Sequence, residues 1–167
     1  MKRFTYIFWF LAVSSISLTS CSKDSLGEEL ETAELNTGVI PVSYSSFELN
    51  VLDLVNDYRI ENGLKELDIL DDGSRQAEEH NNHMIEEDEV CHDGFPNRYS
   101  ALVNSVKAKA VSENVAYGYR TAEAVVNAWI KSEGHRENML GNHTHFGISI
   151  TENSEGKFYF TNIFVRK

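Results

Sequence analysis

The stretch that decides the fold runs from residue 112 to residue 148 and reads SENVAYGYRTAEAVVNAWIKSEGHRENMLGNHTHFGI. From 121 to 133 its apolar residues recur at helical spacing, which predicts an amphipathic helix that Thr121 caps and Gly134 ends. Residues 146–151 then alternate between apolar and polar side chains, as a half-buried strand does. A helix followed so closely by a strand is typical of a domain that mixes both kinds of element.

The chain before this stretch predicts two more helices. Ser45 and Glu48 have the spacing of a capping box, so a helix is expected to begin there and to stop at Gly63. A second helix is expected to begin near residues 72–74 and to end in the acidic run 86–89. Its buried face would carry Ala77, His80 and Met84.

The chain after this stretch predicts a partner for the strand at 146–151. Residues 157–165, KFYFTNIFV, again favour a strand, and the polar segment 153–156 between the two is typical of a tight turn. Helices on either side of a sheet built from this hairpin predict an α+β fold of three layers, an α-β-α sandwich.

Length and charge restrict the class of protein. A chain of 167 residues is long enough for one domain with a substantial core, and 41% apolar residues fit a globular fold. The formal net charge is −11, and loss of residues 1–20, which hold Lys2 and Arg3 but no acid, would make it about −13. Such an acidic surface repels phosphate backbones, so we expect no nucleic-acid partner.

Residues 1–20 have the layout of a secretory signal peptide, with Lys2 and Arg3 followed by an apolar segment. The sequence LTSC at 18–21 then resembles a bacterial lipobox, which implies a lipid on Cys21 and cleavage before it. A transmembrane helix or plain secretion are the alternatives, but the segment is short for a membrane span. We expect an outer membrane lipoprotein, on the periplasmic or cell-surface face, held to the membrane by its lipid anchor.

Residues 21–45 form an acidic segment that is rich in Ser and Thr and has no sustained apolar period. Such a composition is typical of a flexible tether, and a coil of about 24 residues spans roughly 25–30 Å. The folded domain is therefore expected over residues 46–167, held clear of the membrane surface.

The chain has two cysteines, Cys21 and Cys91. With a lipid on Cys21, Cys91 has no partner within the chain, so no disulfide framework is expected and the core must supply the stability. Beside His92, Cys91 could act as a reactive thiol or as a metal ligand. The alternative, which we favour, is a small and partly buried apolar residue that leads into the following turn.

Three polar side chains stand at the edges of expected elements: His92 in the CHDGF segment, Glu113 before the helix at 121–133, and His135 after it. Loops converge at such edges, so the three side chains are expected to face one cleft. Two imidazoles and a carboxylate can bind a divalent ion such as Zn²⁺ and leave a coordination position open. The alternative is structural, with Glu113 capping backbone amides and His135 fixing the turn after Gly134.

The other histidines do not form a familiar metal motif. His80 and His83 are three residues apart, whereas a helical zinc protease motif needs a spacing of four with a glutamate beside the first histidine. We expect His80 in the core and His83 in solvent, and loop roles for His143 and His145.

Six segments carry a resemblance to a known family, and they read LVNDYRIENGLKEL (54–67), AEEHNNHM (77–84), HDGFPNR (92–98), SENVAYG (112–118), AWIKSEGHRENML (128–140) and HFGISI (145–150). This pattern resembles the CAP or SCP-like domain of cysteine-rich secretory, venom allergen and pathogenesis-related proteins, in its small bacterial branch. The resemblance extends over nearly all of the chain beyond Phe47. It implies the same three-layer α-β-α sandwich.

The family lines a cleft with two histidines and two acidic residues. His92, Glu113 and His135 match three of these positions, whereas the second acid corresponds to Ser132, with Glu133 next to it. The resemblance therefore implies a cleft of these four residues, in which His92, Glu113 and His135 would hold zinc or another divalent cation.

Three functions remain open. The first is an extracellular binding module whose cleft holds a metal and whose grooves take an apolar or glycan ligand, as the resemblance implies. The second is a hydrolase that uses Ser132, His135 and Glu113 or a metal-activated water, although no GxSxG or HExxH motif supports it. The third is a surface-interaction protein with a vestigial site. We favour the binding module, and neither its ligand nor its oligomeric state follows from the sequence.

Overall fold

The computed structural model describes residues 40–167, so the signal peptide, the expected lipidation site at Cys21 and most of the tether lie outside the described residues. The described chain alternates helices and strands in the order α1, β1, α2, α3, β2, α4, α5, β3, β4. The helices are α1 (Ser46–Glu61), α2 (Asp71–Glu87), α3 (Phe95–Val106), α4 (Ala122–Lys131) and α5 (Glu133–Met139). The strands are β1 (Asp68–Ile69), β2 (Ala110–Tyr117), β3 (His145–Glu152) and β4 (Phe158–Arg166).

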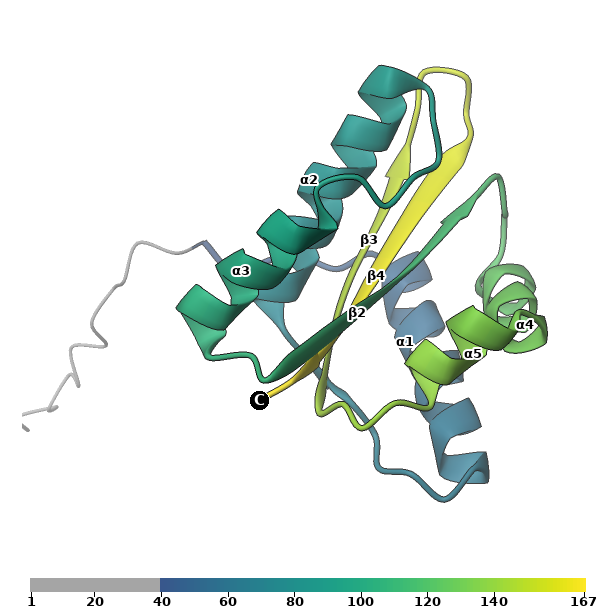
Figure 1. Ribbon diagram of the computed structural model, residues 1–167. Helices are drawn as coiled ribbons and strands as arrows, with labels where there is room; N and C mark the ends of the chain where they lie inside the picture. The colour runs from purple at the N-terminus through teal and green to yellow at the C-terminus, as the bar shows by residue number, and fades with distance from the viewer. Residues whose placement is uncertain (1–39) are drawn as a thin grey trace, which may run out of the picture. The chain divides into compact units, whose positions relative to one another are not determined.

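A four-stranded sheet runs through the centre of the domain, in the order β1-β3-β4-β2 (Figure 1). β3 and β4 form the expected antiparallel hairpin, with Phe146 opposite Phe164. β2 lies antiparallel on the other side of β4, where Glu113 stands opposite Ile163. Because β2 has a strand on one side only, its other edge must satisfy its backbone groups with side chains or solvent.

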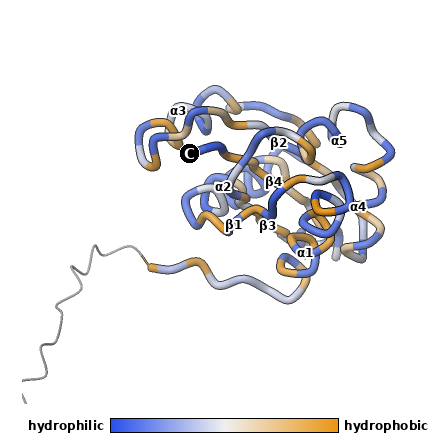
Figure 2. Tube along the Cα trace, turned by 90° about the horizontal axis from the view of Figure 1, so that it is seen from below, coloured by the Kyte–Doolittle hydropathy of each residue, from blue (hydrophilic) through white to orange (hydrophobic). Residues whose placement is uncertain are grey.

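Helices cover both faces of this sheet, which confirms the α-β-α sandwich. α2 and α3 lie on one face, and α1, α4 and α5 lie on the other (Figure 1). Apolar and polar positions alternate along the trace, as expected for elements with one buried side (Figure 2). The larger core, beside α1, α4 and α5, includes Trp129, Phe146, Phe160 and Phe164. The smaller core on the opposite face contains Leu70, Ala77, Leu102, Ala108, Ile163 and Val165.

Capping contacts fix the ends of α1 and α4 as the sequence predicts. Glu48 N donates to Ser45 Oγ (3.2 Å) and Ser45 N donates to Glu48 Oε2 (2.8 Å), which completes the capping box. At the start of α4, Ala124 N donates to Thr121 Oγ1 (3.2 Å). After α1, Gly63 takes a positive φ of 74°, a backbone conformation that suits glycine at the end of a helix.

The structure differs from the sequence prediction around Gly134, and it contains four elements that the sequence pattern does not indicate. α4 already ends at Lys131, because Ser132 takes an extended backbone (φ −88°, ψ 123°), and Gly134 lies inside α5 rather than ending a helix. The unforeseen elements are β1, α3, β2 and α5. Four consecutive residues of β2 are buried, so this strand lacks the alternation that marks a half-buried strand.

A pair of glycines brings α2 unusually close to β3. A Cβ added to Gly147 would lie 2.6 Å from Ser74 N and closer still to the backbone of Gly73. The same approach allows Ile148 N to donate to Ser74 Oγ (3.0 Å). The contact sets how deeply α2 packs on the sheet, and with it the position of His80.

Candidate functional site

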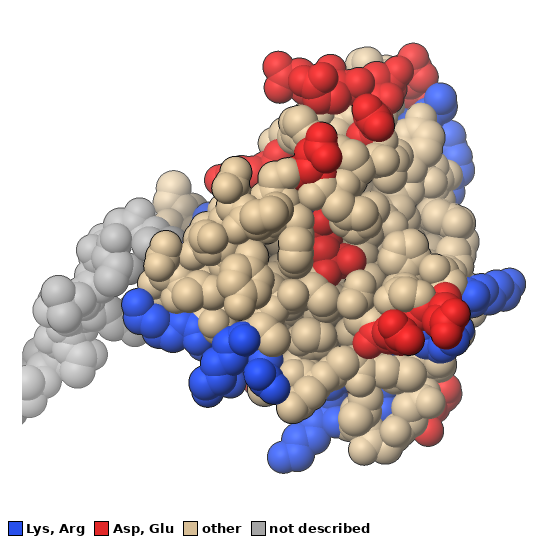
Figure 3. Space-filling view, viewed as in Figure 1, with Lys and Arg blue, Asp and Glu red and all other residues tan. Residues whose placement is uncertain are grey.

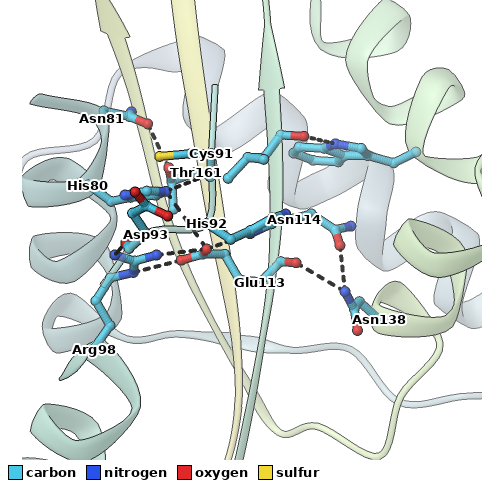
Figure 4. A network of polar contacts seen from close by, with 12 residues as sticks. His80, Asn81, Cys91, His92, Asp93, Arg98, Glu113, Asn114, Asn138 and Thr161 are labelled. Atoms are coloured by element: carbon cyan, nitrogen blue, oxygen red, sulfur yellow. Dashed lines mark hydrogen bonds and ion pairs between the residues drawn. The ribbon is translucent and has the colours of Figure 1, made fainter. Parts of the chain in front are cut away.

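The site is built around the buried carboxylate of Glu113 on β2. Its side chain is 2% exposed and accepts two hydrogen bonds from Arg98 of α3, from Nε to Oε2 and from Nη2 to Oε1, both 2.8 Å (Figure 4). A guanidinium that bonds both oxygens of a carboxylate is among the strongest pairings available to a buried charge. The pair therefore fixes Glu113 in place.

His92 lies in the loop between α2 and α3 and contacts the same carboxylate. Its Nδ1 is 2.8 Å from Glu113 Oε1, while its side chain is 53% exposed (Figure 4). An ionised carboxylate can only accept, so the proton of this hydrogen bond lies on Nδ1. When the ring is neutral, Nε2 then carries a free lone pair, and within residues 40–167 it has no hydrogen-bond partner.

The loop that carries His92 is held by its backbone carbonyls. Arg98 Nη1 donates to Asp93 O (2.6 Å), and His80 Nε2 donates to Cys91 O (2.9 Å). His80 lies in the core, as expected, and is 3.8 Å from Glu113 Oε1. Burial lowers the pKa of His80, and the charge of Arg98 lowers it further, against the opposing effect of Glu113. A neutral His80 thus acts as a donor that supports the loop.

His135 lies on α5, which packs against β2. Burial lowers the pKa of His135, and the neighbouring charge of His92 lowers it further. Two asparagines attach α5 to β2: Asn114 Nδ2 donates to His135 O (3.0 Å) and Asn138 Nδ2 donates to Glu113 O (3.0 Å). The free edge of β2 therefore fixes α5, and with it His135.

A hollow of about 260 Å³ opens at this edge of the sheet. Its lining combines polar and apolar side chains, namely His92, Phe95, Val111, Ser112, Glu113 and Asn138. Neither His135 nor Ser132 belongs to this lining. Ser132 lies at the junction of α4 and α5, where its side chain makes no capping hydrogen bond. The structure thus does not form the hydrogen-bonded pair of Ser132 and His135 that a serine nucleophile would need.

The three expected metal ligands differ in whether their ligand atoms are available to bind an ion. Both oxygens of Glu113 are engaged by Arg98, so the carboxylate is placed to orient His92 and would have to leave Arg98 to bind an ion. His92, which lines the hollow, keeps its Nε2 available as a nitrogen ligand. The sequence pattern does not indicate a role in the site for Arg98 or Phe95, although both lie in the HDGFPNR segment beside His92.

Within residues 40–167, no helix has the length and apolar character needed to cross a membrane.

The CAP family, described as the cysteine-rich secretory protein family, matches residues 52–165. The uncharacterized protein YkwD of Bacillus subtilis (strain 168) is 35% identical over 116 residues, which are 67% of this chain and 45% of that protein. The chain spans less than half the length of the curated relatives that it matches.

Solved structures share the same fold. An outer surface protein from Borrelia burgdorferi superposes with a TM-score of 0.67 at 19% identity, over 77% of this chain and 98% of that chain. An extracellular protein containing a SCP domain from Bacillus anthracis (strain Ames) has a TM-score of 0.62 at 23% identity, over 77% of this chain and 45% of that chain. With the family match covering most of the described residues, the chain belongs to the CAP family, the cysteine-rich secretory protein family.

Proposed function

We propose that this protein is a membrane-anchored extracytoplasmic binding module whose cleft holds a divalent cation between His92 and His135. The observation that carries the proposal is the ordered chain of contacts from Arg98 through Glu113 to His92. It presents one imidazole nitrogen, Nε2 of His92, at the mouth of the cleft. Zinc is the cation that best suits imidazole ligands in an open site.

Glu113 has a supporting role in this proposal. Metal-binding histidines commonly donate their second ring N–H to a carboxylate, which fixes the ring and raises its basicity as a ligand. The 2.8 Å contact between His92 Nδ1 and Glu113 Oε1 has this form. Glu113 would therefore tune the site from outside the coordination sphere, with His92 and His135 as ligands and solvent or a bound molecule in the remaining positions.

The rest of the cleft suits a partly apolar ligand. Phe95 and Val111 line the hollow of about 260 Å³ beside Ser112 and Asn138, which can hydrogen-bond. A mixture of apolar walls and a few polar groups is typical of small-molecule sites. An apolar or glycan ligand that also contacts the cation is the class that we favour.

The relatives and the N-terminal sequence support the proposed cellular setting. Structures of the same fold include an outer surface protein and an extracellular protein, which supports a location outside the cytoplasm. The LTSC segment at 18–21 supports a lipid anchor on Cys21, in the outer membrane. A lipidated tether would hold the cleft in the periplasm or at the cell surface.

Calorimetric titration with zinc tests the cleft. His92→Ala and His135→Ala should each bind about one zinc ion fewer than the wild type and should remain folded, because neither side chain belongs to the core. His145→Gln is the matched control, since His145 begins β3 outside the lining of the cleft. Zinc uptake that is equal in the wild type and in both cleft variants would exclude this function.

Hydrolysis is the second candidate, and the His92–Glu113 contact favours it. A histidine oriented by a buried carboxylate can act as a general base, and a cation in the cleft could activate a water molecule as the nucleophile. Ester and peptide substrates should then be cleaved by the zinc-loaded wild type and not by His92→Ala. Turnover no faster than in buffer would leave the binding function alone.

A further inference from the structure

A second group of metal-ligating side chains lies beside the cleft but does not belong to it. Nitrogen, sulfur and oxygen ligand atoms of His83, Cys91 and Asp93 all lie within 4.8 Å of one another. Within residues 40–167 they are the only three His, Cys, Asp or Glu side chains gathered so closely. We propose that these three residues form a separate site for Zn²⁺ or another thiophilic divalent cation.

Two elements bring the ligands together. His83 lies on α2, one turn after His80, and the two rings stack with their centroids 6.0 Å apart. Cys91 and Asp93 lie in the loop that follows, on either side of His92, which instead contacts Glu113. The loop therefore separates two sites: its middle residue faces the cleft and its outer residues converge on His83.

Hydrogen bonds to backbone carbonyls hold the loop in this shape. The carbonyl of Cys91 accepts from His80 (2.9 Å) and that of Asp93 accepts from Arg98 (2.6 Å), so the backbone of both ligands is already fixed. Gly94 follows with a positive φ of 71°, which turns the chain into α3. Fixed backbones reduce the entropy lost when ligands bind an ion.

The ligand set suits zinc in particular. A thiolate and a carboxylate supply two negative charges and an imidazole supplies a neutral nitrogen, which together neutralise a divalent ion. Tetrahedral zinc places its ligand atoms roughly 3.3–3.8 Å apart, so side-chain rotations of modest size would close the observed spacing. The soft thiolate disfavours Mg²⁺ and Ca²⁺, and water would occupy the fourth position.

The surroundings allow a cation to enter. His83 and Asp93 line a hollow of about 450 Å³ that also receives the carboxylate of Glu79. Four exposed acidic residues, 86–89, follow His83 at the end of α2, where acidic side chains gather on the surface (Figure 3). Their field raises the local concentration of cations. Cys91 is half-buried, beside an apolar cluster that includes Met84 and Tyr159.

Cobalt titration of the full chain tests this site, because a thiolate bound to Co²⁺ gives a near-ultraviolet charge-transfer band that an all-imidazole cleft cannot give. The wild type should show the band, and Cys91→Ser should lose it. Cys21→Ser is the matched control and should keep it. Loss of a residue that only supports a ligand costs roughly 10–100-fold in metal affinity, so His83→Ala, which removes a ligand, should weaken Co²⁺ binding by more than about 100-fold.

Two further measurements keep the result interpretable. His92→Ala should keep the charge-transfer band while losing the ion of the cleft, so failure of one site is distinguishable from failure of the other. If Cys91→Ser does not fold, alkylation of Cys91 by iodoacetamide replaces the cobalt test. Zn²⁺ should protect Cys91 from alkylation in Cys21→Ser, and this protection should be lost when His83→Ala is added. Absence of the band in the wild type, or an unchanged Co²⁺ affinity in His83→Ala, overturns the proposal.

Discussion

Glu113 keeps a carboxylate where water hardly reaches it, since its side chain is 2% exposed. An unpaired charge at such a position costs several kcal/mol, and this cost is offset only by good geometry and complete hydrogen bonding. Arg98, itself 7% exposed, meets this requirement because it donates a hydrogen bond to each oxygen of the Glu113 carboxylate. The orientation of His92 therefore depends on a side chain that does not itself enter the proposed chemistry.

This dependence predicts a strong coupling between Arg98 and Glu113. Arg98→Ala should lower the free energy of unfolding by about 3–5 kcal/mol, because it leaves the buried carboxylate without its cation. The double variant Arg98→Met with Glu113→Gln should cost much less than the sum of the two single changes, Arg98→Met and Glu113→Gln. Urea unfolding of the wild type and these variants measures the difference. Costs that simply add would show that the two charges do not stabilise each other.

The types of residue in the sequence predict some members of the candidate site but not the others. His92, Glu113 and His135 could be nominated because imidazoles and a carboxylate stand at the edges of expected elements. The role of Arg98 could not, because it depends on α3, which brings Arg98 to a partner 15 residues away on another element. Ser132 was expected in the cleft from its position three residues after Trp129, but neither Ser132 nor His135 lines the hollow.

The free edge of β2 shows how elements determine the shape of the site. In an antiparallel pair, alternate residues turn both backbone groups away from the partner strand. On β2 two such carbonyls are taken up by helices: Trp129 Nε1 donates to Val115 O (3.2 Å) and Asn138 Nδ2 to Glu113 O (3.0 Å). α4 and α5 thereby cover an edge at which another strand could add. The sequence did not reveal β2, because its pattern of burial has no period of two.

The surroundings of Gly147 on β3 and of Gly134 on α5 predict opposite effects for substitution by alanine. Gly147→Ala should destabilise the fold by about 1–3 kcal/mol, because its Cβ would collide with the backbone of Gly73 and Ser74. Gly134→Ala should stabilise it by about 0.5–1 kcal/mol, since the residue lies inside α5 and no atom would lie within 4 Å of its new Cβ. Thermal unfolding of both variants beside the wild type measures these shifts. A stable Gly147→Ala variant would mean that α2 does not need this close approach.

At the scale of the whole molecule, the sandwich could be predicted because its largest elements have clear periods. The amphipathic patterns of α1, α2 and α4 and the alternation in the β3–β4 hairpin are each readable in isolation, and they require layers on both sides of a sheet. The pairing of β2 with β4 could not be read, because it joins segments that are distant in the sequence. Local periods therefore predict the layers, while long-range pairing decides where the cleft opens.

The anchor is the prediction that concerns the molecule as a whole. Acyl chains hold a protein to a membrane through roughly 0.8 kcal/mol per buried methylene, so a lipid on Cys21 would account for most of the membrane affinity. Cys21→Ala should therefore move the protein from the detergent phase to the aqueous phase in a phase-partition experiment and abolish incorporation of labelled fatty acid. Cys91→Ser, the matched cysteine change within the folded domain, should stay in the detergent phase. A Cys21→Ala protein that still partitions with the detergent would mean that the membrane is contacted by some other part of the chain.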